Sequence, residues 1–126
     1  MQLMDYWDTI VHGAPWLFLI YFAWKQFFSS SHKEALNQMK TMVADPKTHI
    51  IDVREVGEFN NGHFKGAINI PLSQITGNIH KIKAMGGNKI LYCRSGNRSG
   101  QAIKMLQAKG VTDLYNGGGL SDLKSL

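Results

Sequence analysis

The sequence predicts an α/β domain in which a small parallel β-sheet is flanked by helices on both faces. Apolar, β-favouring runs at 49–53, 67–70, 90–92 and 111–115 alternate with segments of helical periodicity, which is the pattern of a parallel sheet. The first of these runs is mostly apolar, as expected of a strand buried on both faces. The length of 126 residues fits one domain of this kind, and a single cysteine excludes an intrachain disulfide.

A hydrophobic segment, residues 1–30, precedes the predicted domain at residues 31–126. Residues 16–24 are an unbroken apolar run, and aromatic residues continue beyond Lys25. We interpret residues 6–28 as a helix that associates with a membrane, either by spanning it or by lying at its surface. Lysines after the run then predict a membrane-associated protein with its folded domain in the cytoplasm. A helix that packs on the domain or in a homodimer is the alternative.

The predicted domain begins with a helix. Three serines at 29–31 indicate a hinge, and Ser31 with Glu34 has the form of a capping box. The helix then runs through a stripe of Leu and Met residues that we expect to be core packing. Asp45-Pro46 ends it.

The later elements alternate between strand and helix. In order, the sequence predicts a strand at 49–53, a short helix near 55–59, a strand at 67–70, a helix at 72–82, a strand at 90–92, a helix from 99 to about 110, a strand at 111–115, a tight glycine turn at 116–119 and a short helix or tail from 120.

Cys93 lies where the strand at 90–92 ends and the next helix is about to begin. In open α/β sheets, ligands bind at this end of the strands. The loop after it consists of Arg94, Ser95, Gly96, Asn97, Arg98 and Ser99. Unpaired backbone N–H groups at a helix N-terminus and nearby cations lower the pKa of a thiol from about 8.5.

The loop is therefore predicted to hold an anion. That anion is the Cys93 thiolate, a persulfide on the same sulfur, or an oxyanion brought in as substrate. A reactive cysteine also needs partial exposure to solvent. The alternative is that Cys93 is a buried structural thiol. The two arginines in the following loop favour a reactive cysteine.

Four segments of the sequence resemble the rhodanese-like sulfurtransferases, in the order found in that family. They are Ile51–Arg54 with Glu58-Phe59, Gly62–Pro71, Tyr92–Ser99 and Asn116–Gly119. The resemblance covers residues from about 33 to 120 and implies a rhodanese-like fold. It also implies that sulfane sulfur moves from thiosulfate or a persulfide donor, through a Cys93 persulfide, to a thiol or cyanide acceptor.

The resemblance also assigns supporting roles. In similar sulfurtransferases, residues equivalent to Asp52 and Arg54 lie beneath or beside the catalytic loop, and His63 is equivalent to a structural residue of a turn. Some relatives have an arginine near the position of Glu58 that contacts the substrate. An acid at this place weakens the prediction that the chain handles thiosulfate through that contact.

Two other functions compete with sulfur transfer. Thiolate-plus-arginine loops of related shape cleave phosphate esters or reduce arsenate, but Arg98 is only the fifth residue after Cys93, which makes the loop one residue short for that class. A membrane-tethered binding or sensor module is the other alternative, in which catalysis is incidental.

Composition restricts the partners. The formal charge of +5 suits small anionic sulfur donors or an anionic membrane surface. No basic stripe is interleaved with aromatic residues, so we expect no nucleic acid. The five histidines are scattered and have no cysteine partners, so we expect no metal and no cofactor.

Overall fold

The structure is a computed structural model and describes residues 12–126. The described chain has two compact units: the first ends at Asn37, and the second comprises Gln38–Leu126. The second unit contains the whole sheet.

Helix α2 (Pro15–Ala44) is continuous, so the hinge predicted at residues 29–31 is wrong. The Ser30 and Ser31 hydroxyls donate hydrogen bonds of 3.0 and 3.1 Å to carbonyls three residues earlier. The helix continues because these bonds satisfy the serine side chains within it.

The predicted membrane span, and the membrane localisation drawn from it, are also wrong. Among residues 12–126, no helix is sufficiently long and apolar to cross a membrane. The unbroken apolar run of α2 is residues 16–24, and Lys25, Gln26 and three serines follow it within the helix, whereas a span needs about 20 mostly apolar residues. Residues 6–11 of the predicted segment lie outside the described residues. The predicted cytoplasmic placement of the folded domain depended on a spanning helix, so this prediction has lost its basis.

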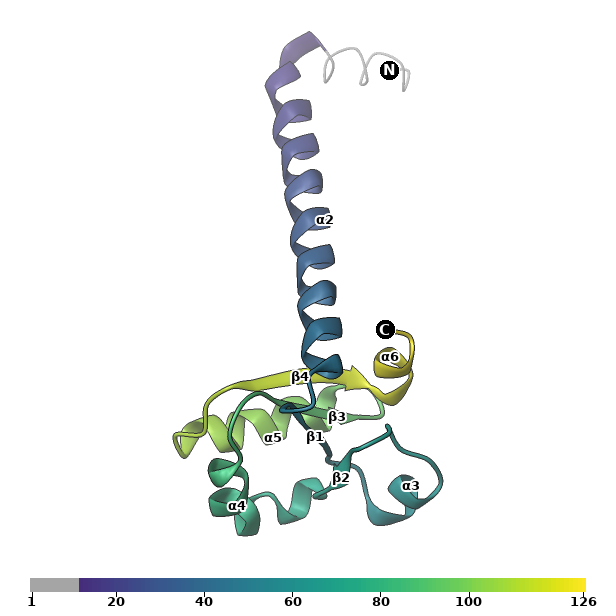
Figure 1. Cartoon of the computed structure of the whole chain (residues 1–126). Coiled ribbons are helices and arrows are strands. Elements are labelled where there is room, and N and C mark those ends of the chain that lie inside the picture. Colours follow the sequence, from purple (N-terminus) through teal and green to yellow (C-terminus); the bar gives the residue numbers. More distant parts are fainter. Residues whose placement is uncertain (1–11) are drawn as a thin grey trace, which may run out of the picture. The chain divides into compact units, whose positions relative to one another are not determined.

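The predicted parallel sheet is confirmed (Figure 1). It consists of β1 (His49–Asp52), β2 (Ile68–Asn69), β3 (Lys89–Cys93) and β4 (Leu114–Gly119), in the order β2-β1-β3-β4. All neighbouring strands are parallel, and Asp52 of β1 is aligned with Tyr92 of β3. The carboxyl ends of the two central strands therefore lie at one edge of the sheet.

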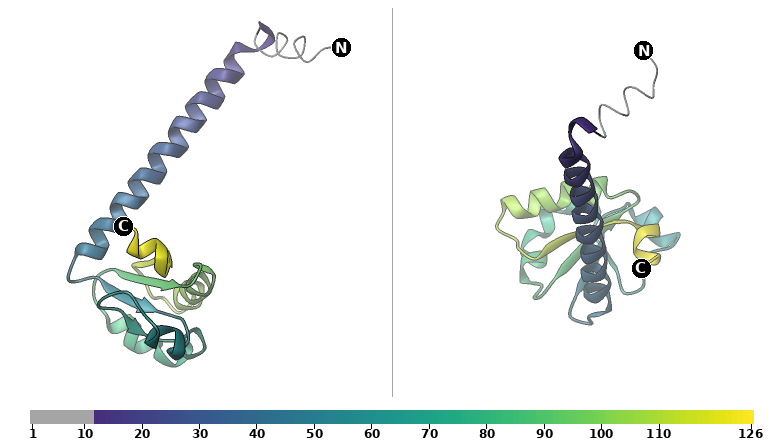
Figure 2. Two further views of the ribbon diagram at one scale, coloured as in Figure 1. Left: turned by 90° about the vertical axis from the view of Figure 1, so that its right-hand side faces the viewer. Right: turned by 90° about the horizontal axis from the view of Figure 1, so that it is seen from above.

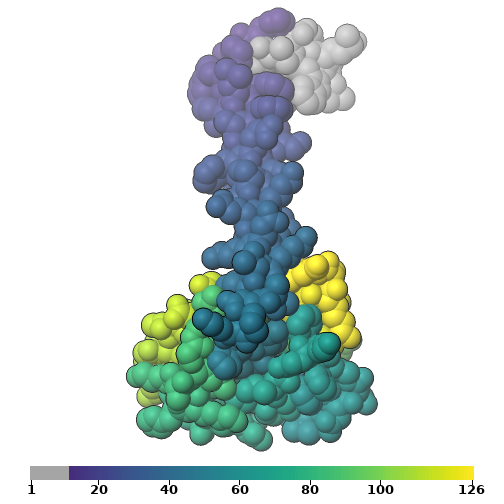
Figure 3. All heavy atoms as spheres, in the orientation of Figure 1, coloured from purple at the N-terminus to yellow at the C-terminus, as the bar shows by residue number. Residues whose placement is uncertain are grey.

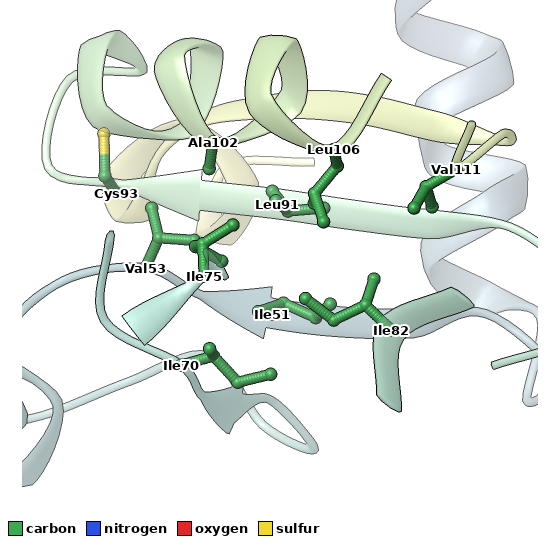
Figure 4. Close-up of a cluster of buried hydrophobic side chains, with 10 residues drawn as sticks. All are labelled: Ile51, Val53, Ile70, Ile75, Ile82, Leu91, Cys93, Ala102, Leu106 and Val111. Carbon is green, nitrogen blue, oxygen red and sulfur yellow. The ribbon is translucent and has the colours of Figure 1, made fainter. Parts of the chain in front are cut away.

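Helices cover both faces of this sheet, as predicted. The left view of Figure 2 shows α6 (Leu120–Lys124) on one side and α4 (Ile79–Ala84) on the other. Successive β3 side chains point to opposite faces: Leu91 and Cys93 pack in one core cluster, and Ile90 and Tyr92 in the other. The first cluster also contains Ala102 and Leu106 of α5 (Asn97–Ala108) (Figure 4).

The remaining elements are short. They are α3 (Val56–Asn60) and the 3₁₀ turns η1 (Leu72–Gln74) and η2 (Thr76–Asn78). The helix predicted at 72–82 is thus divided into η1, η2 and α4, and Gly77 is within the second 3₁₀ turn. Glycine weakens a helix because it loses the most backbone entropy on folding.

The glycine run at 117–119 continues β4 and does not form the predicted turn. A Cβ on Gly119 would collide with the carbonyl oxygen of Arg94, and one on Gly117 would lie 2.9 Å from the Ile90 side chain. The glycines are therefore needed because other parts of the chain approach β4 closely. The loop after Cys93 is one of those parts.

Candidate active site

Cys93 is the last residue of β3, and its side chain faces the core cluster that packs against α5. Figure 4 shows its sulfur at the end of the strand, next to the turn that leads into α5. The placement of the sulfur between a strand end and a helix start follows the sequence-based prediction. The residue is only 1% exposed, however, whereas the sequence predicted a partly exposed thiol.

The burial has a local cause. Arg94, Ser95 and Asn97 are exposed, and the backbone between them folds back over the sulfur, so that the Gly96 N–H donates to Cys93 Sγ at 3.0 Å. Gly96 adopts a φ of 92° as the N-cap of α5, a conformation that glycine reaches without a steric penalty. The sulfur is therefore covered by the loop that holds it.

The loop lowers the pKa of Cys93 to about 7. Burial by itself raises this pKa, but hydrogen bonds from the backbones of Ser99, Ser95 and Gly96 are among the contacts that outweigh it. These N–H groups belong to the loop and the first turn of α5, where they have no partner within the helix. Backbone amides, more than the two arginines, thus stabilise the thiolate.

Ser99 and Asn116 fix the loop against β4. Ser99 Oγ lies 3.6 Å from Cys93 Sγ and donates a 2.7 Å hydrogen bond to Asn116 Oδ1. Asn116 Nδ2 donates to the Gly96 carbonyl at 3.0 Å. A single amide side chain therefore contacts both the start of the loop's helix and its left-handed glycine. The sequence indicated Asn116 only as part of a glycine-rich motif and gave it no role.

Arg98 is held by Glu58 of α3. Its two terminal nitrogens donate to the two carboxylate oxygens at 2.7 and 3.0 Å. The hydrogen bond from Arg98 lowers the pKa of Glu58 to about 2 and outweighs the opposing effect of desolvation, and the same contact raises the pKa of Arg98. The guanidinium that the sequence assigned to the anionic donor is thus already bound to a carboxylate.

Arg94 differs from Arg98. Its side chain is exposed, and within residues 12–126 the two ion pairs are Arg54–Asp52 and Arg98–Glu58. Arg94 is therefore the loop cation available to an incoming anion. Ser95 and Asn97 are exposed beside it and contribute no side-chain hydrogen bond that reaches the sulfur.

Asp52 and Arg54 form a buried ion pair behind the loop. Arg54 donates to the Asp52 carboxylate through its backbone, at 2.9 Å, and through its guanidinium, at 2.7–3.0 Å. The Tyr92 hydroxyl donates to the same carboxylate at 2.8 Å and accepts from the Phe64 backbone at 2.9 Å. The pair therefore supports Tyr92, the residue immediately before Cys93, and among residues 12–126 it makes no hydrogen bond to the loop.

Two further residues lie near this support. Arg54 also donates to the Gly62 carbonyl at 2.7 Å, which fixes the turn after α3. His63 Nδ1 lies 2.9 Å from the Phe59 carbonyl, and its ring stacks on Phe59 at 3.7 Å. The structure thus places His63 in the turn, as the sequence predicted, and brings it into no contact with Cys93. No metal-binding cluster of three or more His, Cys, Asp or Glu side chains occurs within residues 12–126.

Comparisons with known proteins find similar sequences and similar folds. The family model described as "Rhodanese-like domain" matches residues 35–125. The thiosulfate sulfurtransferase PspE of Escherichia coli is 38% identical over 76 residues, which are 60% of this chain and 73% of PspE. The protein YqhL of Bacillus subtilis is 35% identical over 99 residues, 79% of this chain and 78% of YqhL. A solved rhodanese with anions from E. coli is 40% identical, with a TM-score of 0.53 and coverage of 60% of this chain and 89% of that one.

Proposed function

The chain belongs to the rhodanese-like family, and on that premise we propose that it transfers sulfane sulfur through a persulfide on Cys93. The donor is thiosulfate or a persulfide, and the acceptor is a thiol or cyanide. The observation that carries the proposal is the Cys93 sulfur under the loop that leads into α5, with the Gly96 N–H at 3.0 Å and a pKa lowered to about 7.

The first half-reaction loads the enzyme. The Cys93 thiolate attacks the outer sulfur of thiosulfate, a new S–S bond forms, and sulfite leaves with the electron pair of the broken bond. No general base is required, because at neutral pH a large fraction of a thiol with this pKa is already thiolate. The loop amides that stabilise the thiolate are also placed to stabilise the negative outer sulfur of the persulfide.

The second half-reaction unloads it. A thiolate or cyanide attacks the outer sulfur, and the Cys93 thiolate is the leaving group. The low pKa of Cys93 favours this step, since a thiol of lower pKa leaves faster. Two successive transfers through a covalent intermediate predict ping-pong kinetics.

Access to the sulfur requires movement of the loop. Cys93 is 1% exposed, so a donor reaches it only when the exposed part of the loop, Arg94 to Asn97, moves aside. Motions of surface loops occur on timescales of nanoseconds to microseconds, which are short compared with a typical turnover.

The phosphatase alternative is less well supported by the geometry. Cleavage of a phosphate ester requires the loop arginine to bind the phosphate oxygens with its guanidinium. In this chain Glu58 accepts hydrogen bonds from both terminal nitrogens of Arg98.

A binding module in which Cys93 does not react is the second candidate. The observation that favours it is the burial of the sulfur. The two candidates differ in one measurable property: only the sulfurtransferase forms a covalent adduct with its donor.

Intact-mass spectrometry tests the proposed function. Incubation with thiosulfate should add about 32 Da, the mass of one sulfur atom, and cyanide should remove it and yield thiocyanate. Cys93→Ser should show no adduct. Absence of the adduct in the wild-type chain, with Cys93 reduced at the start, would contradict sulfur transfer from thiosulfate and favour the binding module.

A further inference from the structure

A pocket of about 510 Å³ adjoins the Cys93 loop and is distinct from the sulfur site. Its walls come from Glu58 of α3 and Gly62 of the turn after it, from Arg94 of the loop, and from Leu120 and Lys124 of α6. In Figure 3, the yellow C-terminal residues lie next to the teal residues that follow β1. The volume is within the range typical of sites for small molecules.

The pocket adjoins both ends of the loop. Arg94 immediately follows Cys93, and adjacent Cα atoms are about 3.8 Å apart. Glu58 lines the pocket and also holds Arg98 at the beginning of α5. A molecule in the pocket is therefore next to the segment that must move to expose the sulfur.

The pocket has an excess of positive charge. The charged groups in its wall are Arg54, Glu58, Arg94 and Lys124. Asp52 neutralises Arg54, and Arg98 neutralises Glu58. Arg94 and Lys124 have no carboxylate within ion-pair distance among residues 12–126, so they are the two cations that an anionic ligand meets. Leu120 adds an apolar side chain to the wall.

We propose that this pocket binds the carboxylates of a small thiol that accepts sulfur from the Cys93 persulfide. The proposal rests on the proposed function and specifies its acceptor. The acceptor thiolate attacks the outer sulfur, one S–S bond forms and the Cys93–sulfur bond breaks. The electron pair of that bond returns to Cys93 as its thiolate, the proton of the acceptor thiol goes to solvent, and no external oxidant or reductant is needed.

The charge of Lys124 provides the test, because Lys124 lines the pocket but is not part of the loop. Mercaptosuccinate, with two carboxylates, and 2-mercaptoethanol, with none, are each mixed with the preformed persulfide in single-turnover experiments. In Lys124→Gln we expect discharge to mercaptosuccinate to slow about two- to fivefold, as for the loss of one exposed charge contact. Discharge to 2-mercaptoethanol should be unchanged, and Lys124→Arg should restore the wild-type rate.

Lys104→Gln is the matched control, since Lys104 is an exposed lysine of α5 that does not line the pocket. The difference between the two thiols should also shrink at high salt, because salt screens exposed charges. Equal slowing with both thiols, or no slowing with either, would overturn the proposal.

A binding measurement separates this proposal from the proposed function. S-methyl mercaptosuccinate cannot accept sulfur, so its binding is independent of any persulfide. Titrated into the ¹⁵N-labelled reduced protein, it should shift the amide signals of Arg94 and Lys124, with weaker binding in Lys124→Gln. Absence of such shifts would overturn the pocket assignment even if the persulfide forms. Shifts in a protein that forms no persulfide would support the anion-binding pocket but contradict sulfur transfer through Cys93.

Discussion

Replacement of Asp52 by Asn should destabilise the second unit strongly. Asp52 is fully buried, and its carboxylate accepts hydrogen bonds from Arg54 and Tyr92. Asn keeps the size of the side chain but presents an N–H₂ group to one of these donors, and it removes the charge that balances Arg54. Because Arg54 is itself only 7% exposed, its charge is left buried without a counter-ion.

The size of the effect follows from this burial. Breaking a buried ion pair by removal of one partner costs about 3–5 kcal/mol. For a domain of this size about 4–8 °C of melting temperature is lost per kcal/mol, so the midpoint should fall by about 12 °C or more. The free energy of unfolding is measured by urea denaturation, and the melting temperature by circular dichroism.

Asp113→Asn is the matched control, because Asp113 is exposed and the chemical change is the same. Asp113 has a φ of 58°, and Asn tolerates the left-handed region as Asp does, so we expect a change within about 0.5 kcal/mol. A loss below about 1 kcal/mol in Asp52→Asn, as for an exposed ion pair, would refute the argument that the pair supports β3 from a buried position.

Three further predictions concern the loop. Gly119→Ala should cost about 1–3 kcal/mol, because the new Cβ collides with the Arg94 carbonyl oxygen; Gly57→Ala, with open space around its Cβ, is the control in the same urea assay, and equal stabilities would contradict the close approach. Glu58→Gln should raise the rate of loading by thiosulfate severalfold at low salt, because it frees Arg98 and removes a negative charge; stopped-flow kinetics that show no increase would contradict this. The Glu58–Arg98 pair should also contribute about 1 kcal/mol of stability above pH 4.5. Because folding lowers the pKa of Glu58 from 4.5 to about 2, this contribution is lost as the pH falls through that interval, so the urea curves of the wild type and Glu58→Gln should converge near pH 2.

The sequence predicted the sheet because its strands are short and almost wholly apolar. Residues 49–53 and 90–92 become β1 and β3, the two central strands, and the residues between them contain the edge strand β2 and several short helices. The glycine run at 117–119 was predicted as a turn because such runs are typical of turns. Because these glycines have no side chains, β4 packs closely against the Cys93 loop and the Ile90 and Leu123 side chains. Local sequence does not reveal such contacts.

The site was predicted only in part, because local sequence does not reveal contacts between distant residues. The position of Cys93 at a strand end follows from local patterns. The hydrogen-bond partners of the neighbouring residues do not follow from local patterns, because Tyr92 binds Asp52 and Arg98 binds Glu58, each forty residues away in the sequence. The only signal for the second pair was an acid where some relatives have an arginine. The burial of the sulfur could not be predicted, because it depends on how the loop folds back.

The pH dependence of Cys93 alkylation tests the central claim most directly, since it reports both the charge of the sulfur and its accessibility. Because Cys93 is the only cysteine, the rate constant with iodoacetamide can be read from the native protein without correction for other thiols. We predict that this rate rises with pH along one titration curve with a midpoint at about 7. A midpoint at about 8.5 or above, as for an ordinary thiol, or no reaction in the folded state at any pH, would contradict the claim that the loop holds a reactive thiolate.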